Sequence, residues 1–196
     1  MLKLIAAGIV AVGFWQLSGA ALIHAKAWLA PVLIERAWEK GLAGNEKIRP
    51  WPWADTWPVA KLEAPSRDIT HYVLAGTNGG SLPFGPGHMD GTALPGEPGS
   101  IVIAAHRDTH FKFLHDIRPG EKLQLTGLNG LTRIFEVTDQ EIVDARVHGI
   151  EPLDSGSELI LITCQPTSEF IYRGPFRLVV TAKPVKQFRQ MKRQAP

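Results

Sequence analysis

Cysteine is nearly absent from this chain, since Cys164 is the single one among 196 residues. A lone cysteine excludes a disulfide within the chain and any metal site built from several thiolates. Its thiol is therefore packed and inert, chemically reactive, or paired with another molecule. Which of these applies depends on where the fold places Cys164.

A strong charge of either sign is also missing. Lys and Arg number 21 against 19 Asp and Glu, a net charge of +2, which gives no general case for nucleic-acid binding. No Gly-rich phosphate loop occurs, and His106 and His110, although four residues apart, do not lie together on one predicted helix, so no cofactor is expected. Four residues superficially offer metal ligands: His106, Asp108, His110 and His115. The first two alternate on an extended segment and the last two are a helical turn apart, so no metal site is predicted.

Ionisable side chains are absent from Leu4 to Ile23. About 20 apolar residues at a rise of 1.5 Å are enough to cross a hydrocarbon core of about 30 Å. We predict a transmembrane anchor over residues 1–27, with Lys3 holding the N-terminus in the cytoplasm. A cleavable signal peptide is the alternative, because Ala25-Lys26-Ala27 matches a small-x-small cleavage pattern. Either way the remaining chain is exported, where a free thiol is a liability unless buried or used.

Residues 28–57 are predicted to lead from the anchor into the folded domain. Apolar residues at helical spacing from Trp28 to Gly41 indicate a helix, either amphipathic at the membrane surface or an ordinary stalk. Three prolines forbid regular helix between Asn45 and Pro58. The three tryptophans of this stretch either lie at the lipid headgroup level or cover one end of the core: Trp51, Trp53 and Trp57.

From residue 58 onward the pattern is all-β. Short apolar or β-branched runs separated by Gly and Pro turns predict eight strands, and hence a closed barrel or sandwich over residues 58–182. One helical stretch is expected from Thr109 to Asp116, and residues 183–196 read as a basic tail. The predicted strands are Val59–Glu63, Ile69–Ala75, Ser100–Ala105, Lys122–Thr126, Leu131–Thr138, Glu141–Asp144, Glu158–Cys164 and Phe176–Ala182.

Two polar residues stand at the ends of buried strands. Cys164 ends the run Leu159–Thr163, and His106 follows the run Ile101–Ala105. Residues at the ends of two apolar strands can meet at one rim of a barrel. Thiolate chemistry needs a nearby base or cation and a donor for the oxyanion, and Arg177 lies near the start of the next predicted strand. The residues alone leave a packed thiol and a nucleophile as open alternatives.

These segments resemble the signature segments of sortases, which are membrane-anchored cysteine transpeptidases with an eight-stranded β-barrel. The resemblance extends over residues 52–182, and two segments are similar to class GN, the Gram-negative, proteobacterial subgroup. The matching segments are Ile103-Ala104-Ala105-His106-Arg107-Asp108-Thr109-His110-Phe111, Leu161-Ile162-Thr163-Cys164, the strand carrying Arg177, Trp51-Pro52-Trp53-Ala54-Asp55-Thr56-Trp57-Pro58 and Phe84-Gly85-Pro86-Gly87-His88.

The resemblance implies a reaction and a role for each matching residue. Cys164 would attack a backbone carbonyl in the C-terminal sorting signal of a substrate protein, forming a thioester that an amine acceptor resolves. His106 would transfer protons to and from the amines, and Arg177, or else Arg173, would stabilise the oxyanion. His88, Thr163 and Arg173 are expected substrate contacts. A class GN sortase would be a single-pass protein of the inner membrane with its catalytic domain on the periplasmic side.

Two departures from the sortase pattern occur. Ala105 stands where glycine is usual, so its methyl group is expected to crowd the floor of the cleft, and the loop between Cys164 and Arg177 is short. Two other functions stay open at this point. A cysteine endopeptidase would resolve the acyl-enzyme with water, and a non-catalytic β-barrel binding protein would keep Cys164 as a packing residue.

Overall fold

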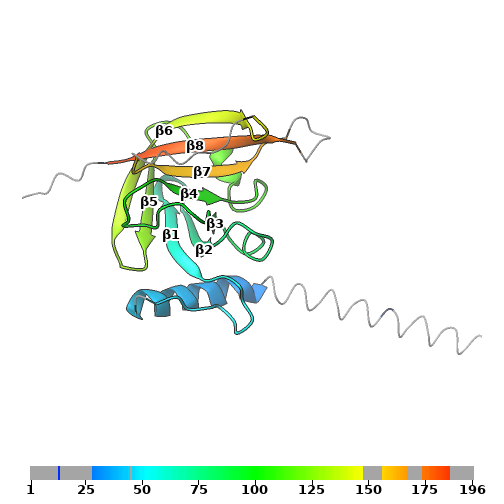
Figure 1. The fold of residues 1–196 in the computed structure, drawn as a ribbon, viewed down its shortest axis with the longest axis vertical. Helices are drawn as coiled ribbons and strands as arrows, with labels where there is room; N and C mark the ends of the chain where they lie inside the picture. Colours follow the sequence, from blue (N-terminus) through cyan, green and yellow to red (C-terminus); the bar gives the residue numbers. More distant parts are fainter. Residues whose placement is uncertain (1–12, 14–27, 45, 148–155, 167–173, 186–196) are drawn as a thin grey trace, which may run out of the picture.

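The computed structural model describes residues 13, 28–44, 46–147, 156–166 and 174–185. Eight strands form a closed barrel in the order β1-β2-β3-β4-β7-β8-β6-β5, as Figure 1 shows. The predicted eight-stranded barrel is confirmed. The strands are β1 Pro58–Ala64, β2 Ile69–Ala75, β3 Gly87–His88, β4 Ile101–Ala104, β5 Lys122–Gly127, β6 Thr132–Asp144, β7 Leu159–Cys164 and β8 Phe176–Pro184.

Two strand predictions were wrong. Leu131–Thr138 and Glu141–Asp144 were predicted as two strands, but the single strand β6 runs without interruption across Asp139 and Gln140. Its register against β8 shifts between Val137 and Asp139, so a bulge accommodates the extra residue while the pairing continues. The second error is that no strand was predicted at β3, because its two residues are too few to show an alternation of polar and apolar side chains. Gly87 is required there, because a Cβ atom would collide with the carbonyl oxygen of Gly76.

Helices are few among the described residues. The predicted helix from Thr109 to Asp116 was wrong in length and type, since only η2, Lys112–His115, forms there, as a short 3-10 helix. A second 3-10 helix, η1 Pro65–Arg67, joins β1 to β2. No helix within the described residues is long and apolar enough to span a membrane. Apart from Gly13, the predicted anchor over residues 1–27 lies outside the described residues.

An N-terminal helix over residues 28–44 lies beneath the barrel, at the end opposite β6 and β8 (Figure 1). The prediction of a helix here is confirmed. One stripe of it is buried at helical spacing, which includes Ala30, Ile34 and Trp38. The Trp38 ring lies 6.1 Å from that of Tyr72 on β2, and the Tyr72 hydroxyl donates to Glu35 Oε1 at 2.9 Å. The helix is therefore docked on the barrel.

Strands β4 and β7 are buried on both faces. Every second residue of each strand points into the barrel interior, where Phe111 and Phe135 also lie. The residues between them belong to a second, smaller cluster on the outside of the barrel. This outer cluster consists of four buried residues, which are Val102, Ile160, Ile162 and Val179. Burial on both faces explains why these two strands read as continuous apolar runs, as parallel strands do. The pair β4–β7 is in fact parallel.

An ion pair fixes η1 to the turn before β5. Arg67 donates to both carboxylate oxygens of Glu121 at 2.6 and 2.8 Å, and these hydrogen bonds hold the pKa of Glu121 at about 2. We expect Glu121→Gln to lower the free energy of unfolding at pH 7 by about 1 kcal/mol, because solvent screens this partly exposed pair. Unfolding curves at several pH values measure the effect.

The pH dependence of that loss has a definite sign. The pKa of Glu121 is depressed in the folded protein, so its stabilisation is complete above the unfolded value of 4.5 and disappears as the pH falls to about 2. The variant and the wild type should therefore converge in stability near pH 2. Glu136→Gln, at an exposed carboxylate on β6, is the matched control and should change stability by less than about 0.5 kcal/mol. A difference that persists unchanged at pH 2 would contradict the ion-pair explanation.

Candidate active site

Cys164 and Arg177 lie on the adjacent strands β7 and β8, and His106 follows two residues after β4, the strand on the other side of β7. Cys164 is paired directly with Arg177 in the antiparallel ladder of β7 and β8. In the parallel ladder of β4 and β7, the last pair is Ala104 with Ile162, and extending this register by two residues predicts that His106 lies opposite Cys164. The backbone N–H of Ala105 donates to the carbonyl of Ile162 at 3.1 Å, which continues the pairing past the end of β4.

The three residues also share one face of the sheet. Side chains alternate along a strand, so residues two apart lie on the same side. Cys164 thus lies on the side of Ile162, His106 on the side of Val102, and Arg177 on the side of Val179. These reference residues all belong to the outer cluster. Neighbouring strands are about 4.8 Å apart, so this alternation predicts that the thiol, the imidazole and the guanidinium lie on one part of the outer surface.

Solvent reaches this part of the surface. The five residues of β7 before Cys164 are buried, whereas Cys164 itself is exposed and its thiol is free. His106 is also exposed, and Arg177 is half-buried. The alternative in which Cys164 is a core packing residue is therefore wrong. A reactive thiol needs this accessibility, and a packed thiol lacks it.

The guanidinium of Arg177 is held by the backbone beside it. Its Nη1 donates to the carbonyl oxygens of Gly174 and Phe176, at 2.8 Å each. An arginine has five N–H donors, and those on Nε and Nη2 have no recorded partner within the described residues. Arg177 is therefore oriented and still able to donate to a ligand. Arg173, the other candidate, lies outside the described residues.

Two further histidines lie near His106. His71 on β2 and His110 pack edge to face, with their ring centroids 5.3 Å apart. Burial, together with smaller contributions from the nearby His71 and His106, lowers the pKa of His110 to about 4. His110 is thus neutral at pH 7 and places no positive charge beside His106. The sequence pattern placed His110 in the signature segment but gave no sign of its contact with His71.

The predicted substrate contact Thr163 faces the barrel interior. Its side chain is buried, and its hydroxyl donates to the carbonyl oxygen of Ala105 at 2.8 Å. This bond joins the ends of β7 and β4, one residue before Cys164 and one before His106. In this position Thr163 fixes the spacing of the two residues that follow.

The bond can be tested with two substitutions. Thr163→Val keeps the volume but removes the donor, so we expect the ends of β4 and β7 to loosen and acylation of Cys164 to slow by about tenfold or more. Thr163→Ser keeps the hydroxyl and should stay within about threefold of the wild-type acylation rate. Single-turnover kinetics measure both variants. Equal rates for the two would contradict a positioning role for the hydroxyl.

His88 lies on the other face of the sheet. It is paired with Ile103, whose side chain is in the barrel interior, and it is itself buried. Its Nε2 lies 2.9 Å from the carbonyl oxygen of Ala93 and 3.1 Å from the hydroxyl of Thr92. The carbonyl accepts only, so Nε2 carries the proton. In this structure His88 anchors the loop after β3 and is not brought to Cys164.

The methyl group of Ala105 belongs to the interior cluster. The expectation that it crowds the cleft floor was wrong, because the strand alternation turns it away from the face that carries His106. The interior accepts it as one more packed apolar group. The short loop after Cys164 lies largely outside the described residues.

A polar cleft of about 360 Å³ borders the site, and sequence analysis did not anticipate it. The residues that follow His106 and Cys164 both contribute to it. The buried amide oxygen of Gln165, Oε1, has no recorded hydrogen-bond partner among the described residues. The cleft is lined by Arg107, Asp108, Lys112, His115, Asp116, Gln165 and Pro166.

The structure is a β-barrel with an exposed cysteine at the end of one strand, a histidine just after the strand on one side, and an arginine on the strand on the other side. This arrangement is typical of an enzyme that uses a thiol as its nucleophile. The sortase domain family matches residues 62–185, which is more than half of the chain. The chain therefore belongs to the sortase family, whose members are cysteine transpeptidases. The resemblance of the sequence to sortases implied this same activity, transpeptidation.

Known proteins agree with this assignment. The chain is 33% identical over 125 residues to sortase D of Bacillus subtilis, covering 63% of this chain and 62% of that protein. Sortase A from Corynebacterium diphtheriae superposes with a TM-score of 0.58 at 27% identity, covering 70% of this chain and 65% of that one. The chain thus spans less than two thirds of the length of both relatives.

A Clostridium perfringens sortase D5 transpeptidase has a TM-score of 0.63 over 80% of this chain and 98% of that one. Its identity is 18%, so this likeness shows the fold alone. None of the three comparisons tests the resemblance to class GN, which stays a prediction.

Proposed function

We propose that this protein is a membrane-anchored transpeptidase of class GN that cuts a C-terminal sorting signal and joins the resulting acyl group to an amine. The observation that supports the proposal is the exposed Cys164 at the end of β7, paired with Arg177 on β8, with β4 and the His106 that follows it on the other side of β7. The uncharged run from Leu4 to Ile23 supports the anchor, and the anchor supports a periplasmic catalytic domain at the inner membrane.

Acylation begins from a Cys164 thiolate and a protonated His106. The sulfur attacks the carbonyl carbon of a peptide bond in the sorting signal, and the carbonyl oxygen takes the negative charge. Arg177 stabilises that oxyanion through N–H groups that its backbone bonds leave available. The C–N bond then breaks, His106 gives its proton to the leaving amine, and a thioester remains on Cys164.

Transfer to the acceptor reverses the proton movement. The polar cleft offers an approach for an amine, because it borders the residues directly after His106 and Cys164. Neutral His106 takes a proton from the amine as its nitrogen attacks the thioester carbonyl, and the thiolate leaves. The starting protonation states are thereby restored. If water takes the place of the amine, the same site acts as a cysteine endopeptidase.

The products of a quenched-peptide library distinguish transfer from hydrolysis. We expect the full chain in detergent to yield a new amide when a small primary amine is added, with a mass equal to acyl fragment plus amine. Hydrolysis alone at saturating amine would favour the endopeptidase. Release of no peptide fragment by the wild-type chain, across the library, would contradict both.

Arg177 has its own test. Arg177→Lys keeps the charge but loses the planar set of donors, so we expect the acylation rate to fall by about 10²-fold. Arg173→Lys tests the alternative assignment and should lower the acylation rate less than Arg177→Lys does. If Arg173→Lys causes the larger loss, the oxyanion role belongs to Arg173. Single-turnover kinetics with one peptide from the library measure both variants.

A further inference from the structure

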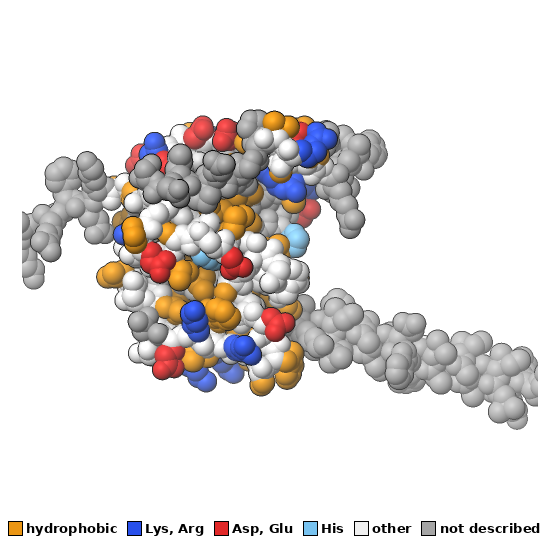
Figure 2. Space-filling view, viewed as in Figure 1, with side chains coloured by type: hydrophobic (Ala, Val, Ile, Leu, Met, Phe, Trp, Pro, Cys, Tyr) orange, Lys and Arg blue, Asp and Glu red, His pale blue; other side chains and the backbone are white. Residues whose placement is uncertain are grey.

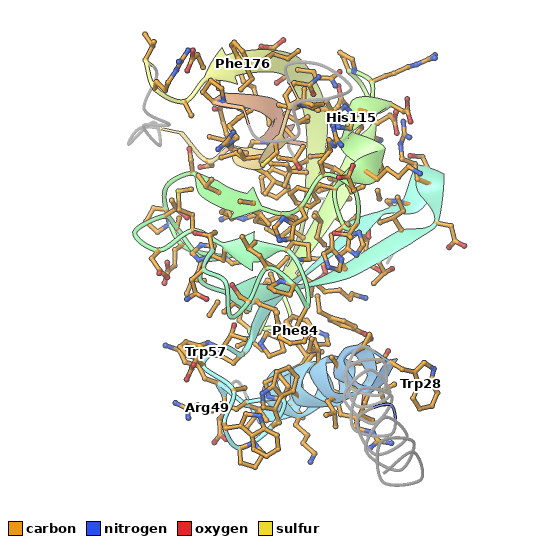
Figure 3. The ribbon with its side chains drawn as sticks, turned by 90° about the vertical axis from the view of Figure 1, so that its right-hand side faces the viewer. Trp28, Arg49, Trp57, Phe84, His115 and Phe176 are labelled. Carbon is orange, nitrogen blue, oxygen red and sulfur yellow. The ribbon has the colours of Figure 1, made fainter. Side chains whose placement is uncertain are left out.

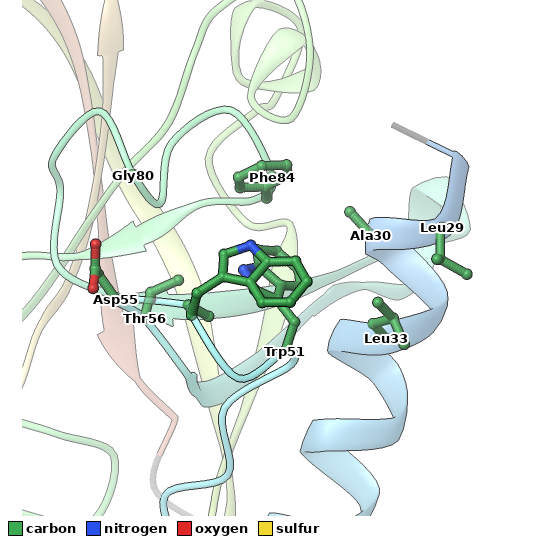
Figure 4. Close-up of a pocket in the computed structure, with 10 residues that line it drawn as sticks. Leu29, Ala30, Leu33, Trp51, Asp55, Thr56, Gly80 and Phe84 are labelled. Atoms are coloured by element: carbon green, nitrogen blue, oxygen red, sulfur yellow. The ribbon is translucent and has the colours of Figure 1, made fainter. Parts of the chain in front are cut away.

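An apolar pocket of about 370 Å³ lies far from the catalytic strands, between the N-terminal helix and the Trp- and Pro-rich segment. Figure 4 shows Ala30 and Leu33 of the helix on one side, with Trp51 and Phe84 on the other. The rings of Trp51 and Phe84 meet edge to face, with centroids 5.2 Å apart. These side chains form apolar walls with open space between them, which is the form of a ligand pocket.

Large apolar side chains are exposed around the pocket. Trp53 and Leu29, which line it, are 76% and 45% exposed, and Trp28 beside Leu29 is 78% exposed. A globular domain that met only water would gain by covering them. Tryptophan, with its apolar ring and polar N–H, is enriched where a membrane meets water. The arrangement is therefore typical of a surface that faces a bilayer.

The sequence brings this pocket close to the predicted membrane span. Six residue steps separate Ile23, the end of the uncharged run, from Leu29. Even a fully extended chain covers only about 20 Å in six steps. The pocket therefore lies at or near the bilayer surface if the run crosses the hydrocarbon core.

Charge does not account for such a contact. Residues 28–57 contain four basic and four acidic side chains, and Figure 2 shows both signs mixed with apolar atoms at this end of the molecule. A surface without net charge gains nothing specific from anionic headgroups. The partner that matches the pocket is thus hydrocarbon.

We propose that this pocket binds an acyl chain of a membrane phospholipid, with Trp53 and Trp28 at the headgroup level. The inference shares the membrane anchor with the proposed function but is independent of the catalytic assignment. It also orients the barrel. Figure 3 shows Phe176 and His115, neighbours of the catalytic strands, at the opposite end of the molecule from the helix. Lipid in the pocket would hold the catalytic residues away from the bilayer surface.

The test uses the full chain in phosphatidylcholine vesicles that contain a phosphatidylcholine with a diazirine in its acyl chain. After illumination, mass spectrometry maps the labelled peptides. We expect label on the helix and on the peptide containing Phe84, which is distant in sequence from the predicted span. Ile142 on β6 is 58% exposed, and its peptide is the internal control that should stay unlabelled. Raising the salt to 1 M should change the pattern by less than twofold.

Two variants make the result specific to the pocket. Leu33→Glu places a charge on its wall and should reduce labelling at Phe84 by at least fivefold, whereas Arg36→Glu, at an exposed residue of the same helix, should leave it within twofold. Label confined to residues 1–27, or equal at Phe84 and Ile142, would overturn the proposal. So would unchanged labelling in Leu33→Glu. Cleavage of a soluble peptide by the same samples is scored separately, so a failure here is distinguishable from failure of the transpeptidase assignment.

Discussion

Replacing Cys164 with alanine is expected to abolish cleavage and transfer to below the detection limit, a loss of at least about 10⁴-fold. The reason is chemical, because no other cysteine exists in the chain to form a thioester. Product formation from one library peptide, followed by mass spectrometry, is the measurement.

The substitution should leave the fold intact. Cys164 is exposed and its side chain lies outside the barrel interior, so removing the sulfur creates no cavity. We expect the free energy of unfolding to change by less than about 0.5 kcal/mol. A Cys164→Ala protein that is folded and still performs transfer would refute the assignment of the nucleophile.

The second large effect is expected for His106. His106→Ala removes the group that protonates the leaving amine and deprotonates the incoming one, which should lower the turnover rate by about 10²- to 10⁴-fold. Steady-state rates across pH 5–9 provide the measurement.

His115→Ala is the matched control for this variant. His115 is also exposed, lies nine residues further along the same connection and lines the polar cleft, yet it is not aligned with Cys164 by any strand. Its replacement should keep the turnover rate within about fivefold of the wild type. An equal loss in the two variants would mean that the strand register does not select the catalytic histidine.

Much of the barrel was predictable from the sequence because its longer strands alternate or are continuously apolar. Leu159–Cys164 and Ile69–Ala75 were predicted close to their observed bounds for this reason. The two failures have physical causes. Polar residues inside β6 are tolerated at a bulge, and the two residues of β3 are fixed by a close backbone approach at Gly87, which no periodicity records.

The candidate site was predictable in part. Both Cys164 and His106 follow apolar strands, so their meeting at one rim was a reasonable inference. What the sequence could not supply is that β4 and β7 are adjacent and parallel, which decides that these two residues stand opposite each other. The sequence also did not show on which face of the sheet each side chain lies, and both Thr163 and His88 lie on the interior face.

The role of the tryptophans needed the structure as well. Sequence patterns allowed both a cover for the core and a contact with lipid. Trp51 packs on Phe84 while Trp53 is largely exposed, so neighbouring tryptophans of one segment have different surroundings. Spacing alone did not separate them, because the prolines between them prevent any regular periodicity.

The central claim, a thioester on Cys164, is tested most directly by the mass of the acylated protein. The wild-type chain is mixed with a cleavable library peptide, quenched in acid within the first turnover, and digested. We predict that the peptide containing Cys164 carries the mass of the acyl fragment and loses it in neutral hydroxylamine. No adduct during active turnover, or an adduct on any other residue, would contradict the claim.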